Sequence, residues 1–182
     1  MSARSKLFLA ALSSLACASS AFAWGGTTQG TINAGGNFFY SSTSAAGSEL
    51  ALEGHGGYYL ADACLVGGAV QALKNDAVTT YDFAGLVKYH LLDPVLRDAD
   101  GRPYAFSPYI GARLGLAHGK NDADSNTGLL AAARVGADVF LTQNVALDFL
   151  VDFAACTGKV FPDDEKLKKS DVVFRFGLDF NF

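Results

Sequence analysis

Apolar and polar residues alternate with a period of two at the end of the chain, over the segment DVVFRFGLDFNF. One parity is apolar throughout and consists of Val172, Phe174, Phe176, Leu178, Phe180 and Phe182. The other parity is polar or glycine, except for Val173. Successive side chains of a β-strand point to opposite faces, so this period predicts a strand with one apolar and one polar face.

The same period recurs in seven earlier segments of about ten residues each, the length of a tilted strand that crosses a bilayer. They cover 31–40, 49–60, 64–73, 79–91, 106–117, 129–141 and 145–155. The segment 64–73 is apolar on both faces, so its orientation stays open. Together with the terminal segment they make eight predicted strands, and this even number with this alternation fits a closed antiparallel up-and-down barrel.

Such a barrel can sit in water or in lipid, because alternation alone does not say which face is inside. A soluble lipocalin-like barrel buries its apolar face, whereas a membrane barrel turns it outward. The aromatic residues form two groups near opposite ends of the predicted barrel, one of Tyr58, Tyr89, Phe106, Phe140, Phe180 and Phe182 and one of Phe38, Tyr40, Tyr81, Phe83, Phe153 and Phe174. Two aromatic belts at interface height are typical of membrane proteins. We therefore predict an all-β, eight-stranded antiparallel up-and-down transmembrane β-barrel, with a soluble ligand-binding barrel as the alternative.

The start of the chain predicts export. Arg4 and Lys6 precede an apolar run at 7–18, and the small-x-small sequence AFA follows. These are the three regions of a secretory signal peptide, here 1–23, which leaves 24–182 as one domain. No run of about 18 apolar residues follows, so no transmembrane helix is predicted.

The last eight residues, RFGLDFNF, suggest where the exported chain goes. Arg175, Gly177, Phe180 and Phe182 stand at the spacing of a polar residue, a glycine, an aromatic residue and a terminal aromatic residue. This ending resembles the C-terminal signal of Gram-negative outer-membrane barrels. The segments GGYYLADACLVGG, SPYIGARLGLAHG and VFLTQNVALDF are similar to strand segments of the small eight-stranded outer-membrane barrel family, of the OmpX and OmpA-barrel type. The resemblance implies an outer-membrane location, contact with lipid and lipopolysaccharide, and recognition by the barrel assembly machinery.

The polar parity would fill the barrel interior with charge. Ten side chains are expected there, namely Glu53, Asp82, Lys88, Arg113, Arg134, Asp138, Asp148, Asp152, Arg175 and Asp179. An eight-stranded barrel is just wide enough for its own side chains, and charges confined in that way must pair. We expect a structural ion-pair network that plugs the lumen, with a narrow ion path as the alternative.

The strands 129–141 and 145–155 predict one register inside this network. If Leu141 lies opposite Val145 across a short turn, Asp138 lies opposite Asp148, and Arg134 lies opposite Asp152. Two carboxylates face to face are destabilising unless a cation bridges them. We expect an inward Arg or Lys to hold the acidic pair, the candidates being Arg134, Lys88 and Arg113.

Catalysis and metal binding find little support in the sequence. A lipid A-modifying enzyme, one alternative, would need a nucleophile beside a base, and only Ser125 could approach His118 across a loop. The stretch 122–128 has the oxygen spacing of a calcium loop, but its glycine comes one position late. The net charge of −4 gives no basic footprint for nucleic acid. We predict no catalytic residues, no cofactor, no metal ligands and no nucleic-acid partner.

The last predicted loop mixes both signs of charge. Its bases, Lys159, Lys166, Lys168 and Lys169, could meet lipopolysaccharide phosphates, but Asp163, Asp164 and Glu165 dilute them. A solvated loop is therefore expected, and a surface partner cannot be named from loops without motifs.

Two cysteines, Cys64 and Cys156, remain after the predicted cleavage. They fall near opposite rims, separated by an apolar band of roughly 25 Å. A disulfide needs Cα atoms within about 7 Å. We expect two unpaired thiols.

Overall fold

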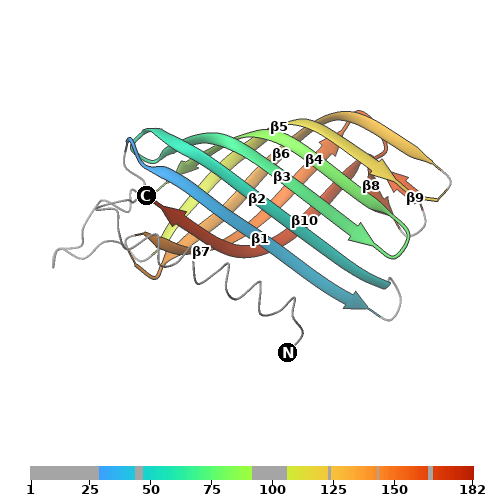
Figure 1. Cartoon of the computed structure of the whole chain (residues 1–182), viewed down its shortest axis with the longest axis horizontal. Coiled ribbons are helices and arrows are strands. Elements are labelled where there is room, and N and C mark those ends of the chain that lie inside the picture. Colours follow the sequence, from blue (N-terminus) through green and yellow to red (C-terminus); the bar gives the residue numbers. More distant parts are fainter. Residues whose placement is uncertain (1–28, 44–46, 92–105, 123, 143, 164–165) are drawn as a thin grey trace.

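The computed structural model describes residues 29–43, 47–91, 106–122, 124–142, 144–163 and 166–182. Eight long strands close into one antiparallel barrel in the order β1-β10-β7-β6-β5-β4-β3-β2 (Figure 1). Their bounds are β1 Ile32–Thr43, β2 Gly47–Ala61, β3 Cys64–Asn75, β4 Thr79–His90, β5 Phe106–Lys120, β6 Ser125–Phe140, β7 Val145–Cys156 and β10 Ser170–Asn181. A short hairpin of β8 Phe161–Asp163 and β9 Lys166–Lys168 lies in the connection between β7 and β10. The predicted fold class and strand number are confirmed.

The predicted signal peptide, 1–23, lies outside the described residues. Within the ranges that the structure describes, no helix is long and apolar enough to cross a membrane.

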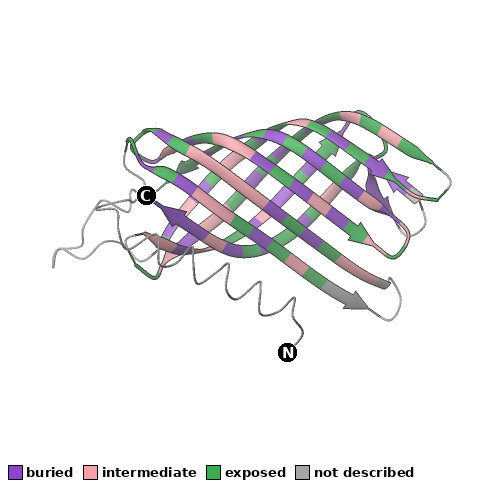
Figure 2. Ribbon diagram, viewed as in Figure 1, coloured by how far each residue is buried: buried purple, intermediate pink, exposed green. Residues whose placement is uncertain are grey.

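Burial alternates along the strands, so each strand has a buried face and an exposed face (Figure 2). In β4, Tyr81 and Phe83 are exposed, whereas Asp82 between them is buried. In β10, Phe174 is exposed beside the buried Arg175. Most large apolar side chains of the strands thus point outward, and most charged side chains of the strands point inward. This is the arrangement of a membrane barrel, and it contradicts the soluble lipocalin-like alternative.

The aromatic belts are largely as predicted, with one exception. All six residues of the second group are exposed. In the first group, Phe180 is only 6% exposed, although its parity places it on the outer side. It lies opposite Ala34 on one neighbouring strand and Val145 on the other, and it lines an outer apolar groove with Leu147. Parity predicts the face that a side chain takes, but it does not predict how far neighbouring strands cover it.

Strand β3, whose orientation the sequence leaves open, turns its odd-numbered residues inward. Leu65 and Gln71 are buried, whereas Val66 and Val70 are exposed. Its register explains the choice, because Gln71 lies opposite the inward Asp82 of β4.

The barrel closes between β1 and β10, and this seam is paired over only part of its length. In β1, 33–38 pair with 176–181 of β10, whereas all of β1 pairs with β2. The ladder stops at Phe38 and Phe176, whose ring centroids lie 4.0 Å apart. Beyond this point the two strands diverge (Figure 1).

Candidate functional site: the charged interior

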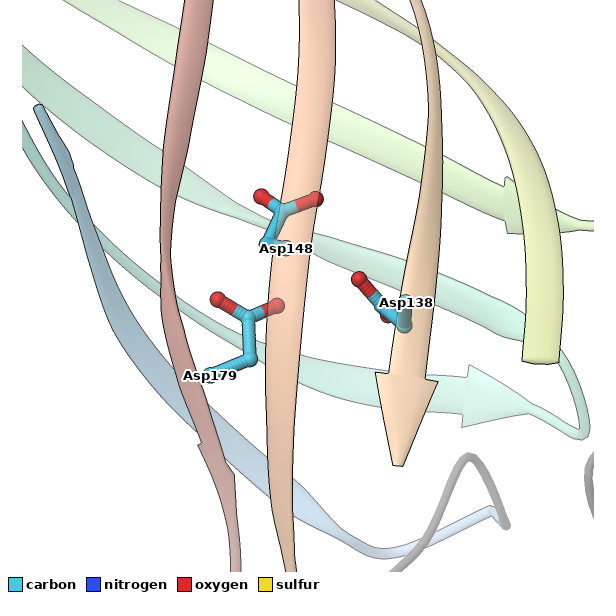
Figure 3. Close-up of side chains that lie close together, drawn as sticks. All are labelled: Asp138, Asp148 and Asp179. Atoms are coloured by element: carbon cyan, nitrogen blue, oxygen red, sulfur yellow. The ribbon is translucent and has the colours of Figure 1, made fainter. Parts of the chain in front are cut away.

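Three carboxylates meet in the half of the barrel nearer the termini of the described chain, where β1 begins and β10 ends. Asp138 of β6 lies opposite Asp148 of β7, and Asp179 comes from β10. Their oxygens lie within 4.8 Å of one another, and all three residues are buried (Figure 3). The predicted register of β6 and β7 is therefore confirmed, and a third acid joins the expected pair.

Lys88 is the cation that holds this acidic node. Its Nζ donates to Asp138 Oδ1 at 3.0 Å and to Asp179 Oδ2 at 2.9 Å. It also lies 4.0 Å from the centre of the Tyr109 ring, where a cation–π contact adds to the attraction. Arg134, one of the expected candidates, does not hold this pair, because its guanidinium binds other acids.

Other oxygens of the node also lie close to protein polar groups. The Tyr109 hydroxyl donates to Asp148 Oδ1 at 2.6 Å, and Asn37 Nδ2 donates to Asp148 Oδ2 at 3.1 Å. His55 Nε2 lies 2.9 Å from Asp179 Oδ1. Ammonium, hydroxyl and amide groups thus bond to oxygens of all three acids, and we describe the cluster as an internal ion-pair node.

A second node, richer in arginine, lies further along the barrel. Arg113 donates to Asp82 at 2.8 Å and to Asp152 at 2.6 Å. Arg134 forms two hydrogen bonds with Glu53, and its NH2 group also donates to Asp152 at 3.2 Å. Opposite Arg134 in the β6–β7 ladder is Asp152, as predicted.

The third guanidinium of this node, Arg175, comes from β10. Its NH1 group donates to Glu53 Oε2 and to Asp152 Oδ2, at 3.0 Å each. Glu53 and Asp152 are therefore each shared by several guanidinium groups. Because these groups come from β5, β6 and β10, the arginine node ties together strands from around the barrel.

His55 connects the two nodes. Its Nδ1 lies 3.5 Å from Glu53 Oε1, and its Nε2 lies 2.9 Å from Asp179 Oδ1. Neither His55 nor the hydrogen-bonding Gln71, Tyr109 and Asn37 was in the predicted network. Their inward parity is the sequence signal that could have found them.

An apolar layer lies beyond the arginine node, towards the end of the barrel away from the termini. Along β6 the order is Asp138, Arg134, Ala132 and Leu130, and the last two belong to this buried apolar cluster. Its members are Ala51, Leu73, Ala84, Ala117, Leu130, Ala132, Ala154, Cys156, Val160, Phe161 and Val173, with Phe39 packed against them.

Two members of this layer come from the connection between β7 and β10. Val160 and Phe161 are buried, and the Thr80 hydroxyl donates to the Val160 carbonyl oxygen. Leu167 of β9 is buried as well. The expectation of a solvated loop is wrong for these residues, because their apolar side chains fold inward over the lumen. Lys159 and Lys169 remain exposed.

A smaller apolar layer lies at the other end of the barrel, where β1 begins and β10 ends. Tyr59, Leu65 and Leu86 form a small buried apolar cluster there. The Tyr59 hydroxyl lies 3.2 Å from His90 Nε2, and His90 Nδ1 lies 2.9 Å from Ser107 Oγ. The charged nodes therefore lie between two less polar layers.

All ten predicted lumen residues are buried. The four residues with the spacing of an assembly signal behave differently from one another. Arg175 belongs to the arginine node, and Gly177 lies so close to Asn37 that a Cβ atom would clash with it. The Phe182 backbone exchanges two hydrogen bonds with Ile32 at the seam.

Two other predictions concern reactive groups. Cys64 and Cys156 are unpaired, as predicted. His118 does not meet Ser125 in the β5–β6 ladder, since its partner there is Thr127, whose Oγ1 lies 2.8 Å from His118 Nδ1.

No family model and no curated protein matches this chain. Several solved structures match it. The N-terminal β-barrel domain of Pseudomonas aeruginosa OprF is 19% identical, with a TM-score of 0.59 over 85% of this chain and 98% of that one. Neisserial surface protein A is 15% identical, with a TM-score of 0.58 over 84% and 96%. The outer membrane protein OprG from Pseudomonas aeruginosa is 16% identical, with a TM-score of 0.52 over 86% and 98%. Together with the outward apolar face, these likenesses show that the chain has the fold of the small eight-stranded outer-membrane β-barrels.

Proposed function

We propose that this protein is an integral outer-membrane barrel that does not conduct ions and has a structural or surface-interaction role. The observation that carries the proposal is the linked pair of ionic nodes inside the barrel. Lys88, Arg113, Arg134 and Arg175 each contact at least two carboxylates. Contacts of this kind link side chains of β2, β4, β5, β6, β7 and β10 across the interior.

An ion that crossed this interior would have to break buried pairs. Removing one partner of a buried ion pair costs about 3–5 kcal/mol, because the other charge is left uncompensated. The ion would also have to pass the apolar layer that contains Val160 and Phe161. Both features support a sealed lumen over a narrow pore.

A non-catalytic role is supported by the surroundings of His118. In a hydrolytic triad one ring nitrogen meets the nucleophile and the other is oriented by a carboxylate. Here Nδ1 of His118 is bonded to Thr127. Within the described residues, no carboxylate is seen to orient the ring. Surface contacts would be made by the connections at the barrel end away from the termini, since binding residues are often carried by loops on a rigid scaffold.

Planar-bilayer recording tests the proposal. The purified wild-type protein is expected to give no stable conductance steps. The triple variant Glu53→Ser, Arg134→Ser and Phe161→Ser removes a bonded pair from the arginine node and a large side chain from the apolar layer, so it is expected to conduct. Stable openings of the wild type would contradict the sealed lumen, whereas a change in lipid A mass caused by the wild type would contradict the non-catalytic role.

A further inference from the structure

The lipid-facing surface of the barrel carries very little charge, and its two basic residues fall together. The eight barrel strands contain six basic residues, of which Lys88, Arg113, Arg134 and Arg175 are buried inside. The other two, Lys74 of β3 and Lys120 of β5, are exposed. A cation on the outer wall of a membrane barrel is tolerated only near the membrane interface. Lys74 and Lys120 are therefore expected to lie at headgroup height, where an anionic partner would stabilise them.

Lys74 and Lys120 lie in one row across three strands. Lys74 is opposite Thr79 of β4, and Thr79 is opposite Lys120. Neighbouring strands lie about 4.8 Å apart, so the two lysine Cα atoms are separated by only about 10 Å. Each ammonium stands on a flexible four-carbon stem, and both can therefore reach the same anion.

A histidine and a tyrosine lie in the next row of the same surface. His118 is exposed and is held by its hydrogen bond with Thr127. Tyr81, directly opposite His118 in the β4–β5 ladder, is 58% exposed. A ring N–H and a phenol O–H can both donate to an anion that sits beside the lysines.

The third row of this surface, further from the rim, is apolar. Val70, Phe83, Leu116 and Leu129 lie opposite one another on four successive strands, and all are exposed. From the rim towards the middle of the barrel, this sector therefore offers ammonium groups, then polar ring groups, then a hydrocarbon wall. This order of groups on the surface matches a lipid with an anionic headgroup and apolar acyl chains.

The strand surface of this sector carries no exposed acid, and the nearest exposed acids on β5 and β6, Asp122 and Asp124, lie beyond Lys120 in the turn between these strands. The strands β3, β4 and β5 contain one acid, Asp82, which is buried and bonded to Arg113. At the rim, Asp76 accepts hydrogen bonds from the backbone and hydroxyl of Ser48. Across the part of the chain that the structure describes, Lys74 and Lys120 form no ion pair.

We propose that Lys74, Lys120 and His118 bind a phosphate group of a glycolipid in the outer leaflet, of the lipid A type, whose acyl chains run along Phe83 and Leu116. The site lies at the barrel end away from the termini, and the proposal places this end at the outer leaflet. Phosphate is the anion fixed at headgroup height there, and charge-assisted hydrogen bonds to ammonium groups bind it strongly. The inference rests on the proposed membrane location.

Native mass spectrometry of the detergent-solubilised barrel with added lipid A tests the site. The variant Lys74→Gln with Lys120→Gln is compared with Lys159→Gln with Lys169→Gln, which removes two exposed lysines from the β7–β10 connection at the same end of the barrel and so matches the loss of charge. The first variant is expected to lose lipid A binding by about tenfold or more, because two charge-assisted contacts are lost. The control is expected to bind as the wild type does. Mobility shifts on boiling verify that both variants are folded.

Three outcomes would overturn the proposal. They are equal binding by both variants, equal binding of dephosphorylated lipid A by the wild type, and equally tight binding of phosphatidylglycerol. The last outcome would mean that the site binds an ordinary phospholipid and does not select the outer-leaflet glycolipid. Bilayer conductance of the same wild-type preparation is measured separately, so a failure of the sealed-lumen proposal is distinguishable from a failure of this site.

Discussion

At the scale of single residues, Lys88 is the side chain on which the acidic node depends. Replacing it by methionine leaves Asp138, Asp148 and Asp179 confined without their shared ammonium. We expect Lys88→Met to lower the free energy of unfolding by about 3–5 kcal/mol, the usual cost of leaving a buried charge uncompensated. Asp148→Asn is expected to cost less, since it removes one of the like charges. Urea unfolding in lipid vesicles measures both.

The matched control for this prediction is Lys169→Met. Lys169 is exposed, and a surface substitution of this kind usually changes stability by no more than about 0.5 kcal/mol. Similar small losses for Lys88→Met and Lys169→Met would show that the node contributes nothing to stability.

The sequence predicts the faces of residues in this interior better than it predicts their partners. Parity places Asp138 opposite Asp148 and Arg134 opposite Asp152, because one turn fixes the register of two adjacent strands. The counterion, Lys88, comes from a strand that is not adjacent to either acid. Contacts across a lumen depend on barrel closure and side-chain length, which period-two alternation does not contain.

At the scale of elements, the β1–β10 seam has the shortest paired ladder between neighbouring strands of the barrel. Ile32 and Phe182 exchange backbone hydrogen bonds, so even-numbered residues of β1 point their amides at β10. The ladder stops after Phe38, which places the amides of Tyr40 and Phe174 beyond it. We expect these two amides to exchange with deuterium faster than that of Phe38, as measured by NMR in lipid nanodiscs.

The Phe39 amide is the internal control for the seam, because Phe39 lies opposite Ala51 in the fully paired β1–β2 ladder. Protection of Tyr40 and Phe174 as strong as that of Phe39 would mean that the seam is closed along its whole length in lipid.

The β7–β10 connection is the element that the sequence predicts least well. Its charged residues predict solvation, but Phe161 is buried in the same apolar cluster as Ala117 and other small residues. We expect Phe161→Ser to release the connection from the lumen, since truncation of a buried phenylalanine costs about 3–5 kcal/mol. Trypsin should then cut after Lys168 or Lys169 faster than in the wild type. Unchanged cleavage, with Lys159→Ser as the surface control, would contradict the inward packing.

At the scale of the whole molecule, the alternation predicts the closed barrel but not which face is inside. The two groups of aromatic residues add that information, and with them the sequence predicts the inward charges. It does not predict the inward orientation of Leu65 in β3, where both faces are apolar, or the depth at which Phe180 is buried. These depend on which strands become neighbours after closure.

Assembly of the whole molecule is expected to depend on its last residue. Deleting Phe182 removes the aromatic end of the proposed assembly signal and two backbone hydrogen bonds to Ile32, without touching the ionic nodes. We expect less folded barrel in the outer membrane, whereas Asn181→Ser, which keeps the terminal aromatic residue, should assemble more efficiently than the deletion. Normal folded levels of the deletion variant, measured on immunoblots of membrane fractions, would argue against the signal.

The central claim is that the chain folds into a lipid-embedded barrel with its charges inside. Heat modifiability of the protein in outer-membrane fractions tests it most directly, because a closed barrel resists detergent until it is boiled. We predict that the unboiled protein migrates differently from the boiled protein on a gel and is found in the outer-membrane fraction. A protein that is recovered in the soluble fraction, with the same mobility before and after boiling, would contradict the account.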